Sequence, residues 1–149
     1  RLFGTGGGWQ PVYQFGPWHE QLLGRRVRDL TVNPSRGPYE VSPERPNQVK
    51  EYRPDRPTLF GLLQRGGTRK IGSNRVLAVA VDGRIEAVGV TFKDGIREAP
   101  GYSILLPPDS LKAGFNRVDI YLVEDQARRL RLLYDGSRPI PPDDESGQN

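Results

Sequence analysis

Alternating apolar residues mark two adjacent strands between residues 75 and 90. The segment Val76–Val81 is followed by Asp82-Gly83 and by a second alternating segment over 85–90. Asp-Gly between two such segments is typical of a two-residue β-hairpin, because both residues tolerate the positive φ angles of a type I′ turn. Both faces of Val76–Val81 are apolar, which indicates a strand buried on both sides.

Further short apolar segments predict more strands along the chain. They span 26–32, 58–63, 102–106, 118–123 and 129–134, and a Gly114-Phe115-Asn116 turn precedes the fourth of them. Only 19–24 is expected to be helical, as one turn closed by Gly24. Residues 64–73 are expected to form a loop, and six prolines between Asn33 and Pro57 argue against a central strand there.

Short strands at fairly even spacing, with turn signals between them, favour a sandwich of two sheets. We therefore predict an all-β, jelly-roll-like β-sandwich with long Pro/Gly-rich loops and little helix. The alternation predicts a core that includes Val76, Ala78, Ala80, Ile85, Ala87, Ile104, Leu106, Val118, Ile120 and Leu122.

The length of 149 residues suits one folded domain. We interpret 1–25 as a Gly- and aromatic-rich N-terminal arm, 26–134 as the β-sandwich domain and 135–149 as a disordered acidic tail. The aromatic residues of 1–21 are expected to pack on this domain's own sandwich, because exposed apolar surface is costly in water. The start Arg-Leu-Phe-Gly is not a natural translation start, and the chain is interpreted as a fragment of a longer protein.

Charge and composition exclude several classes of function. The chain has no cysteine, which excludes disulfides and thiolate chemistry. The net charge is +4 with a pI near 9.6, but the basic residues are interspersed with acidic ones, so nucleic acid is not the expected partner. The basic runs are interpreted as solvated faces. No apolar run approaches the length of a membrane span, so direct membrane insertion by this chain is not expected.

No catalytic set is apparent from the sequence. His19 is the single histidine, and the carboxylates occur alone or beside arginines, as in Arg28-Asp29. Gly6-Gly7-Gly8 lacks the strand and the Gly-Lys-Ser/Thr of a phosphate-binding loop. We expect no enzymatic activity, no cofactor and no metal.

Aromatic residues are the candidates for ligand binding. Trp9, Trp18, Tyr39 and Tyr102 could offer flat faces on which sugars stack. The alternative is that Trp9 and Trp18 anchor the arm on the sandwich or on a neighbouring domain.

Two segments also carry a resemblance to known proteins. Residues 77–85 and the Leu111-x-x-Gly114-x-Asn116-x-Val118 pattern resemble the hairpin and strand of jelly-roll, galactose-binding-like sandwiches. Together with 102–107, they are similar to the extracytoplasmic C-terminal domain of actinobacterial membrane-anchored proteins of the sulfatase-like hydrolase and transferase type. The hairpin of this chain carries Asp82 where that pattern has asparagine, which the turn tolerates equally well.

The resemblance implies a non-catalytic accessory domain, outside the membrane and tethered through a larger parent protein. The expected partner is then the rest of the parent chain. The sulfatase-like nucleophile and metal ligands have no counterpart here, so any active site of the parent lies elsewhere. The second hypothesis is a carbohydrate-binding module for cell-envelope glycans, with a glycan as partner.

Overall fold

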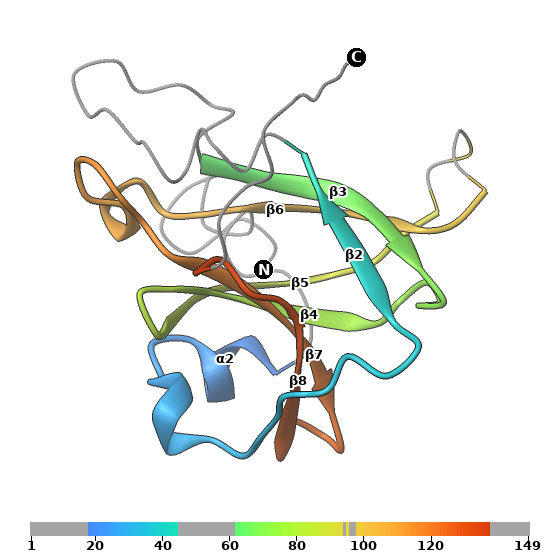
Figure 1. Cartoon of the computed structure of the whole chain (residues 1–149), viewed down its shortest axis with the longest axis horizontal. Coiled ribbons are helices and arrows are strands. Elements are labelled where there is room, and N and C mark those ends of the chain that lie inside the picture. The colour runs from blue at the N-terminus through green and yellow to red at the C-terminus, as the bar shows by residue number, and fades with distance from the viewer. Residues whose placement is uncertain (1–17, 45–61, 94, 96–97, 138–149) are drawn as a thin grey trace, which may run out of the picture.

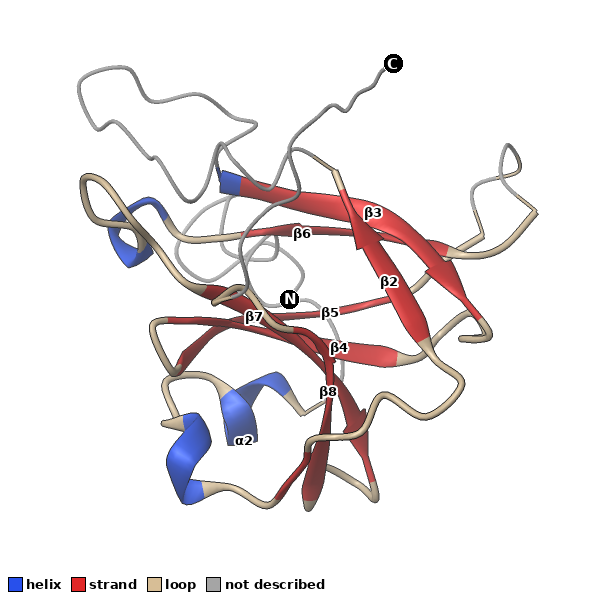
Figure 2. Ribbon diagram, viewed as in Figure 1, coloured by secondary structure: helices blue, strands red, loops and turns tan. Residues whose placement is uncertain are grey.

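The fold consists of two β-sheets, in a computed structural model that describes residues 18–44, 62–93, 95 and 98–137. One sheet has five strands in the order β1-β8-β7-β4-β5, and the other has three in the order β2-β3-β6. The sheets form two layers, and the helical turns within 19–29 lie below the larger one (Figures 1 and 2). The expected all-β sandwich with little helix is confirmed. The elements are α2 (His19–Leu22), η1 (Val27–Asp29), β1 (Val32–Asn33), β2 (Glu40–Pro43), β3 (Leu63–Arg69), β4 (Val76–Val81), β5 (Arg84–Val90), β6 (Gly101–Leu105), η2 (Pro108–Ser110), β7 (Val118–Glu124) and β8 (Arg129–Tyr134).

The β4–β5 hairpin forms as the sequence predicts. Asp82 and Gly83 have φ angles of 49° and 85°, and both are positive as a type I′ turn requires. Every residue of β4 is buried. The strand therefore has apolar neighbours on both faces, which confirms the second part of the prediction.

The predicted core residues are all buried, but they divide between two clusters. Leu77 and Val79 of β4 face the three-stranded sheet, together with the predicted Ile104 and Ile120. The predicted Ala78 lies instead on the outer face of the five-stranded sheet. Because successive side chains of a strand point to opposite faces, β4 and its neighbours contribute to both clusters. Of the ten predicted residues, Ala87, Ile104, Leu106, Val118, Ile120 and Leu122 belong to the inner core, and Val76, Ala78, Ala80 and Ile85 belong to the outer core.

The loop expected over 64–73 is wrong, because most of it belongs to β3. This strand lies between β2 and β6 and pairs with both. Its Gly66 is needed for close packing, since a Cβ there would overlap the carbonyl oxygen of Ser42 and lie 2.7 Å from the hydroxyl of Tyr102. Gly66 thus marks a tight contact between strands rather than a loop. Of the strand expected over 58–63, residues 58–61 lie outside the described part and Leu63 begins β3.

The proline-rich region contains a strand at a position that tolerates proline. β2 forms an edge of the smaller sheet, and Pro43 is its last residue. An edge strand has one side without sheet partners, so a missing N–H is acceptable there. The described part of this region therefore has no central strand, as expected, but it contributes the edge strand β2, which the sequence analysis did not predict.

The strand expected over 26–32 is also wrong. The structure has the η1 turn there, followed by β1. Val27 and Leu30 both pack against the outer core. Residues three apart lie on the same side of a 3₁₀ turn, so their spacing is satisfied by η1 without a strand.

Candidate interaction surface

A strap made of residues 18–33 crosses the outer face of the five-stranded sheet. It is held at one edge by the amides of Gly24 and Val27, which donate to the carbonyls of Ile85 and Gly83 at 2.8 Å each. At the other edge the amide of Leu130 donates to the carbonyl of Thr31 at 2.9 Å. The strap therefore spans the sheet from β5 to β8 and covers the outer core.

The strap begins with the predicted helical turn. The amide of Leu22 donates to the carbonyl of Trp18 at 3.0 Å, and Gly24 follows with a φ of 84°, the left-handed conformation of a helix end. Leu22 is 1% exposed and is packed into the outer core, whereas its neighbour Leu23 is 39% exposed. One side of the turn therefore anchors the strap, and the other side faces solvent.

Four exposed arginines gather where the strap meets β5, and we call Arg25, Arg26, Arg28 and Arg84 the arginine cluster. Arg26 and Arg84 face each other in an antiparallel bridge. In the part of the chain that the structure describes, none of the four guanidinium groups lies within ion-pair distance of a carboxylate. Their polar contacts there go to backbone carbonyls: Arg84 Nη1 lies 3.1 Å from the oxygen of Gly24.

Several arginines elsewhere in the fold have carboxylate partners. Arg131 Nε lies 2.9 Å from Glu124 Oε2, and Arg117 Nε lies 3.0 Å from Asp119 Oδ2. Arg65 and Arg69 lie within ion-pair distance of Glu44 and Glu40. The arginine cluster differs from these arginines, because none of its four guanidinium groups has a carboxylate within ion-pair distance among the described residues.

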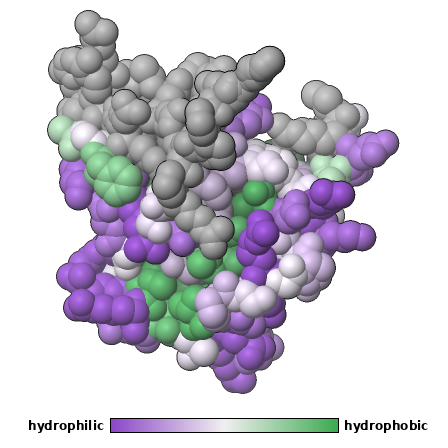
Figure 3. Space-filling model, viewed as in Figure 1, coloured by the Kyte–Doolittle hydropathy of each residue, from purple (hydrophilic) through white to green (hydrophobic). Residues whose placement is uncertain are grey.

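Apolar residues reach the surface beside the arginine cluster. Val27, Leu30 and Val32 of the strap are only partly buried, and Leu23 is exposed. Figure 3 shows apolar residues at the surface around the position of α2 in Figure 1, with hydrophilic residues bordering them. Unpaired arginines next to half-buried apolar side chains are features of protein interaction surfaces.

Buried polar side chains elsewhere in the fold fix the backbone. Asn116 is fully buried; its amide oxygen accepts from the Lys112 amide at 2.9 Å, and its amide nitrogen donates to the carbonyls of Lys112 and Gly114. Thr91 is also fully buried and donates to the carbonyl of Gly72 at 2.7 Å. These contacts hold the turn before β7 and the loop before β4.

Asp119 of β7 is the most deeply buried carboxylate among the described residues, at 2% exposed. Its Oδ1 accepts a hydrogen bond from the Gly136 amide at 2.7 Å, and Arg117 completes the site. Burial raises the pKa of the Asp119 carboxyl, and the Gly136 amide and Arg117 limit the rise. Burial, with a smaller effect of Asp119, raises the pKa of Tyr121 to about 12. These contacts hold the chain beyond β8 as far as Gly136.

The predicted aromatic ligand residues do not come together. Trp9 lies outside the described residues. Trp18 is partly buried against the outer core, on this domain's own sheet. Tyr39 packs against the inner core instead, and the guanidinium of Arg131 covers its ring at 5.7 Å from the centroid.

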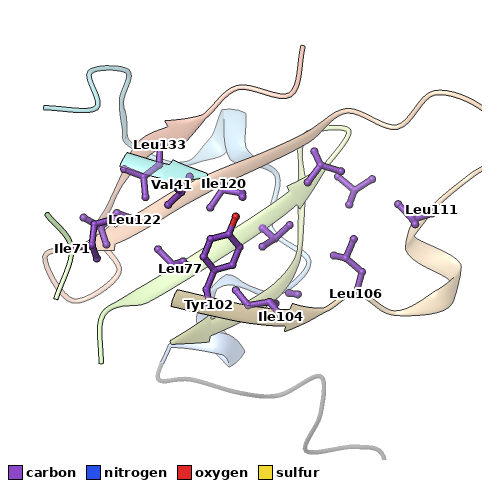
Figure 4. Packing of buried hydrophobic residues seen from close by; sticks show 14 residues of the cluster. Val41, Ile71, Leu77, Tyr102, Ile104, Leu106, Leu111, Ile120, Leu122 and Leu133 are labelled. Atoms are coloured by element: carbon purple, nitrogen blue, oxygen red, sulfur yellow. The ribbon is translucent and has the colours of Figure 1, made fainter. Parts of the chain in front are cut away.

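The structure does not support Tyr102 as a ligand-binding residue. It is 1% exposed, and its ring lies among apolar side chains between the sheets, near Leu77 and Ile104 (Figure 4). A ring buried in the core has no face to offer a sugar. Its position in an alternating strand was a signal for the core.

Comparison with protein-family models, with curated proteins and with solved structures found no match for this chain. Among the residues that the structure describes, no helix has the length and apolar character needed to span a bilayer. In the same residues, His, Asp and Glu form no group of three or more that could hold a metal ion. The arginine cluster is the candidate site, because its exposed guanidinium groups lie beside partly buried apolar side chains of the strap. Only the run Arg25-Arg26-x-Arg28 signalled it in the sequence, and Arg84 joins through the fold.

Proposed function

We propose that this chain is a non-catalytic, extracytoplasmic accessory domain of a larger membrane-anchored, sulfatase-like protein. Its arginine cluster and the exposed side of the strap dock on an acidic surface of the rest of the parent chain. The observation that carries the docking is the concentration of unpaired guanidinium groups beside Leu23 and Val27. Arginine is well suited to such contacts, because its planar group binds carboxylates with two parallel hydrogen bonds.

The non-catalytic assignment is supported by the roles of the buried polar groups. Asn116, Thr91 and Asp119 are each engaged with backbone groups or with Arg117. The extracytoplasmic, sulfatase-like origin is supported by the sequence resemblance. Asn116 belongs to the pattern that carries the resemblance, and it has a structural role, because the conformation before β7 depends on its three hydrogen bonds.

Hydrolysis assays on the purified chain test the non-catalytic assignment. With 4-nitrophenyl sulfate and bis(4-nitrophenyl) phosphate, with and without added Ca²⁺, Mg²⁺ or Mn²⁺, release of nitrophenol should equal the buffer rate. Turnover that follows the protein through repeated purification and scales with its concentration would refute the assignment.

A module for cell-envelope glycans is the second candidate, and the arginine cluster favours glycans that carry carboxylates or phosphates. Under this alternative, polygalacturonate should bind in a saturable and salt-sensitive way, whereas neutral dextran should not. Arg25→Gln/Arg28→Gln should weaken the binding. Arg36→Gln/Lys70→Gln is the control, because it removes the same charge from exposed positions outside the strap. Equal affinity in both variants would exclude the arginine cluster as the glycan site.

A further inference from the structure

Strand β6 is an edge of the three-stranded sheet, because β3 is its strand partner in the described part of the chain. On the β3 side, the amide of Leu106 donates to the carbonyl of Leu62 at 2.9 Å. The backbone groups of successive residues in a strand point to opposite sides, so those of Ile104 also face β3. Ser103 and Leu105 therefore direct their N–H and C=O groups away from β3.

The chain closes the start of this edge and leaves the next residues open. Phe92 and Gly101 exchange two backbone hydrogen bonds, at 2.9 and 2.8 Å. Beyond them, Ser103 is exposed and Leu105 is partly exposed. No backbone hydrogen bond joins the outward groups of these two residues to another described residue. Two N–H and two C=O groups thus lie unpaired along the edge among the described residues.

Strand β6 is also less protected than the other edge strands of the two sheets. β1 has two residues, β2 ends in Pro43, and β5 has a register shift opposite Ala80 and pairs with the strap at Ile85. Such features keep the edge of a sheet from pairing with other chains. β6 has the sequence Gly-Tyr-Ser-Ile-Leu, without charge or proline, and its register with β3 is unbroken. It is therefore the edge at which another strand can add.

The two faces of β6 determine which side chains such a strand would carry. Tyr102 and Ile104 point from β6 into the inner core (Figure 4), whereas Ser103 lies on the exposed face. Side chains of neighbouring strands lie beside each other on each face. An added strand would thus place apolar side chains beside Tyr102 and Ile104, and polar ones beside Ser103. The edge fits an extended segment with an apolar residue at every second position.

A short peptide fits this edge better than a second copy of the chain. Two-fold antiparallel pairing through Ser103 and Leu105 would set Pro107 of the second copy opposite Gly101. Phe92 already occupies the position opposite Gly101. A peptide that ends before Gly101 meets no such obstacle.

We propose that β6 binds a short extended peptide, which adds to the three-stranded sheet as a fourth strand. Main-chain hydrogen bonds to Ser103 and Leu105 supply the affinity, and the alternating apolar side chains of the peptide supply the selectivity. The arginine cluster lies on the strap and on β5 of the other sheet, so the two sites are separate. Peptide binding at β6 therefore does not depend on the proposed function.

Amide NMR of the full chain tests this proposal, with the peptide acetyl-Lys-Val-Thr-Val-Thr-Val-Lys-amide as the probe. In the free chain, the amides of Ser103 and Leu105 should exchange about tenfold or more faster than that of Ile104. Saturating peptide should shift both signals and slow the exchange of both amides about tenfold or more. The same peptide with N-methyl groups on its interior amides should not bind, because it has lost the donors that pair with β6.

A substitution at Ser103 provides the matched test within the protein. Ser103→Pro removes an outward N–H from an exposed residue and no hydrogen bond to β3, so peptide affinity should fall about tenfold or more. Ser103→Thr keeps the N–H and should bind within about twofold of the wild type. Amide spectra away from β6 show whether each variant is folded. If Ser103→Pro does not fold, the N-methylated peptide decides the question.

Three results would overturn the proposal. One is exchange of the Ser103 and Leu105 amides as slow as that of Ile104 in the free chain, since the edge would then already be paired. Another is the absence of saturable shifts at these two amides, or equal binding of the N-methylated peptide. The third is equal peptide affinity of folded Ser103→Pro and Ser103→Thr.

Discussion

Replacing Leu22 with alanine should detach the strap from the sheet, whereas the same change at Leu23 should not. Both leucines belong to the same short helical turn, but Leu22 is 1% exposed and Leu23 is 39% exposed. Leu22→Ala removes three buried carbon groups at about 0.8 kcal/mol each, or about 2.4 kcal/mol, and leaves a cavity. The expected loss of unfolding free energy is about 3 to 4 kcal/mol, within the range for buried leucines. For Leu23→Ala we expect about 1 kcal/mol.

Urea denaturation followed by circular dichroism measures this difference, and amide exchange locates it. The amide of Ile85 donates to the carbonyl of Arg25 at 2.9 Å, so release of the strap should speed its exchange in Leu22→Ala. The reasoning is refuted if the two variants differ by less than about 0.5 kcal/mol. It is also refuted if exchange at Ile85 is equal in both.

Three other predictions follow from buried contacts. Gly66→Ala should destabilise the fold by about 3 kcal/mol or more, because the added Cβ clashes with Ser42. Gly67→Ala should change stability by less than about 1 kcal/mol, because its Cβ meets open space. Equal melting temperatures of the two variants would contradict this prediction. Because the folded pKa of Asp119 is raised, its contribution is complete below the unfolded pKa and is lost as pH rises through the folded pKa. The unfolding free energy of the wild type relative to Asp119→Asn should therefore fall as pH rises from about 4 and then level off, and a rise would contradict the buried site. In alkaline titration followed at 295 nm, Tyr121→Phe should remove a component with a midpoint of about 12, and loss of a component near 10 would show an exposed phenol instead.

The sequence predicts the parts of the fold that depend on local pattern. Val76–Val81 is predicted to be a strand because its apolar side chains alternate between two faces. Asp82-Gly83 is predicted to be a turn because few pairs of residues tolerate a positive φ angle at both positions. The division of the core into two clusters could not be predicted in the same way. With apolar residues on both faces of β4, the pattern does not say which face meets which layer.

The misread segments owe their structure to contacts between distant residues. Gly66 lies in a strand because Ser42 and Tyr102 approach it from β2 and β6, which the local sequence does not show. The arginine cluster has the same origin, since Arg84 reaches Arg26 only through the pairing of the strap with β5. Tyr102 is buried and therefore offers no face to a ligand. The sequence alone did not decide this, because an aromatic residue in an alternating strand can pack in the core as readily as it can line a binding site.

Hydrogen exchange of the strap in the proposed parent protein is the most direct test of the docking surface. Residues 22–28 should exchange more slowly in the intact protein than in the isolated chain. Arg25→Gln/Arg28→Gln should return the intact protein to the rate of the isolated chain, and Arg36→Gln/Lys70→Gln should not. Equal exchange of 22–28 in the isolated chain and the intact protein would contradict the account.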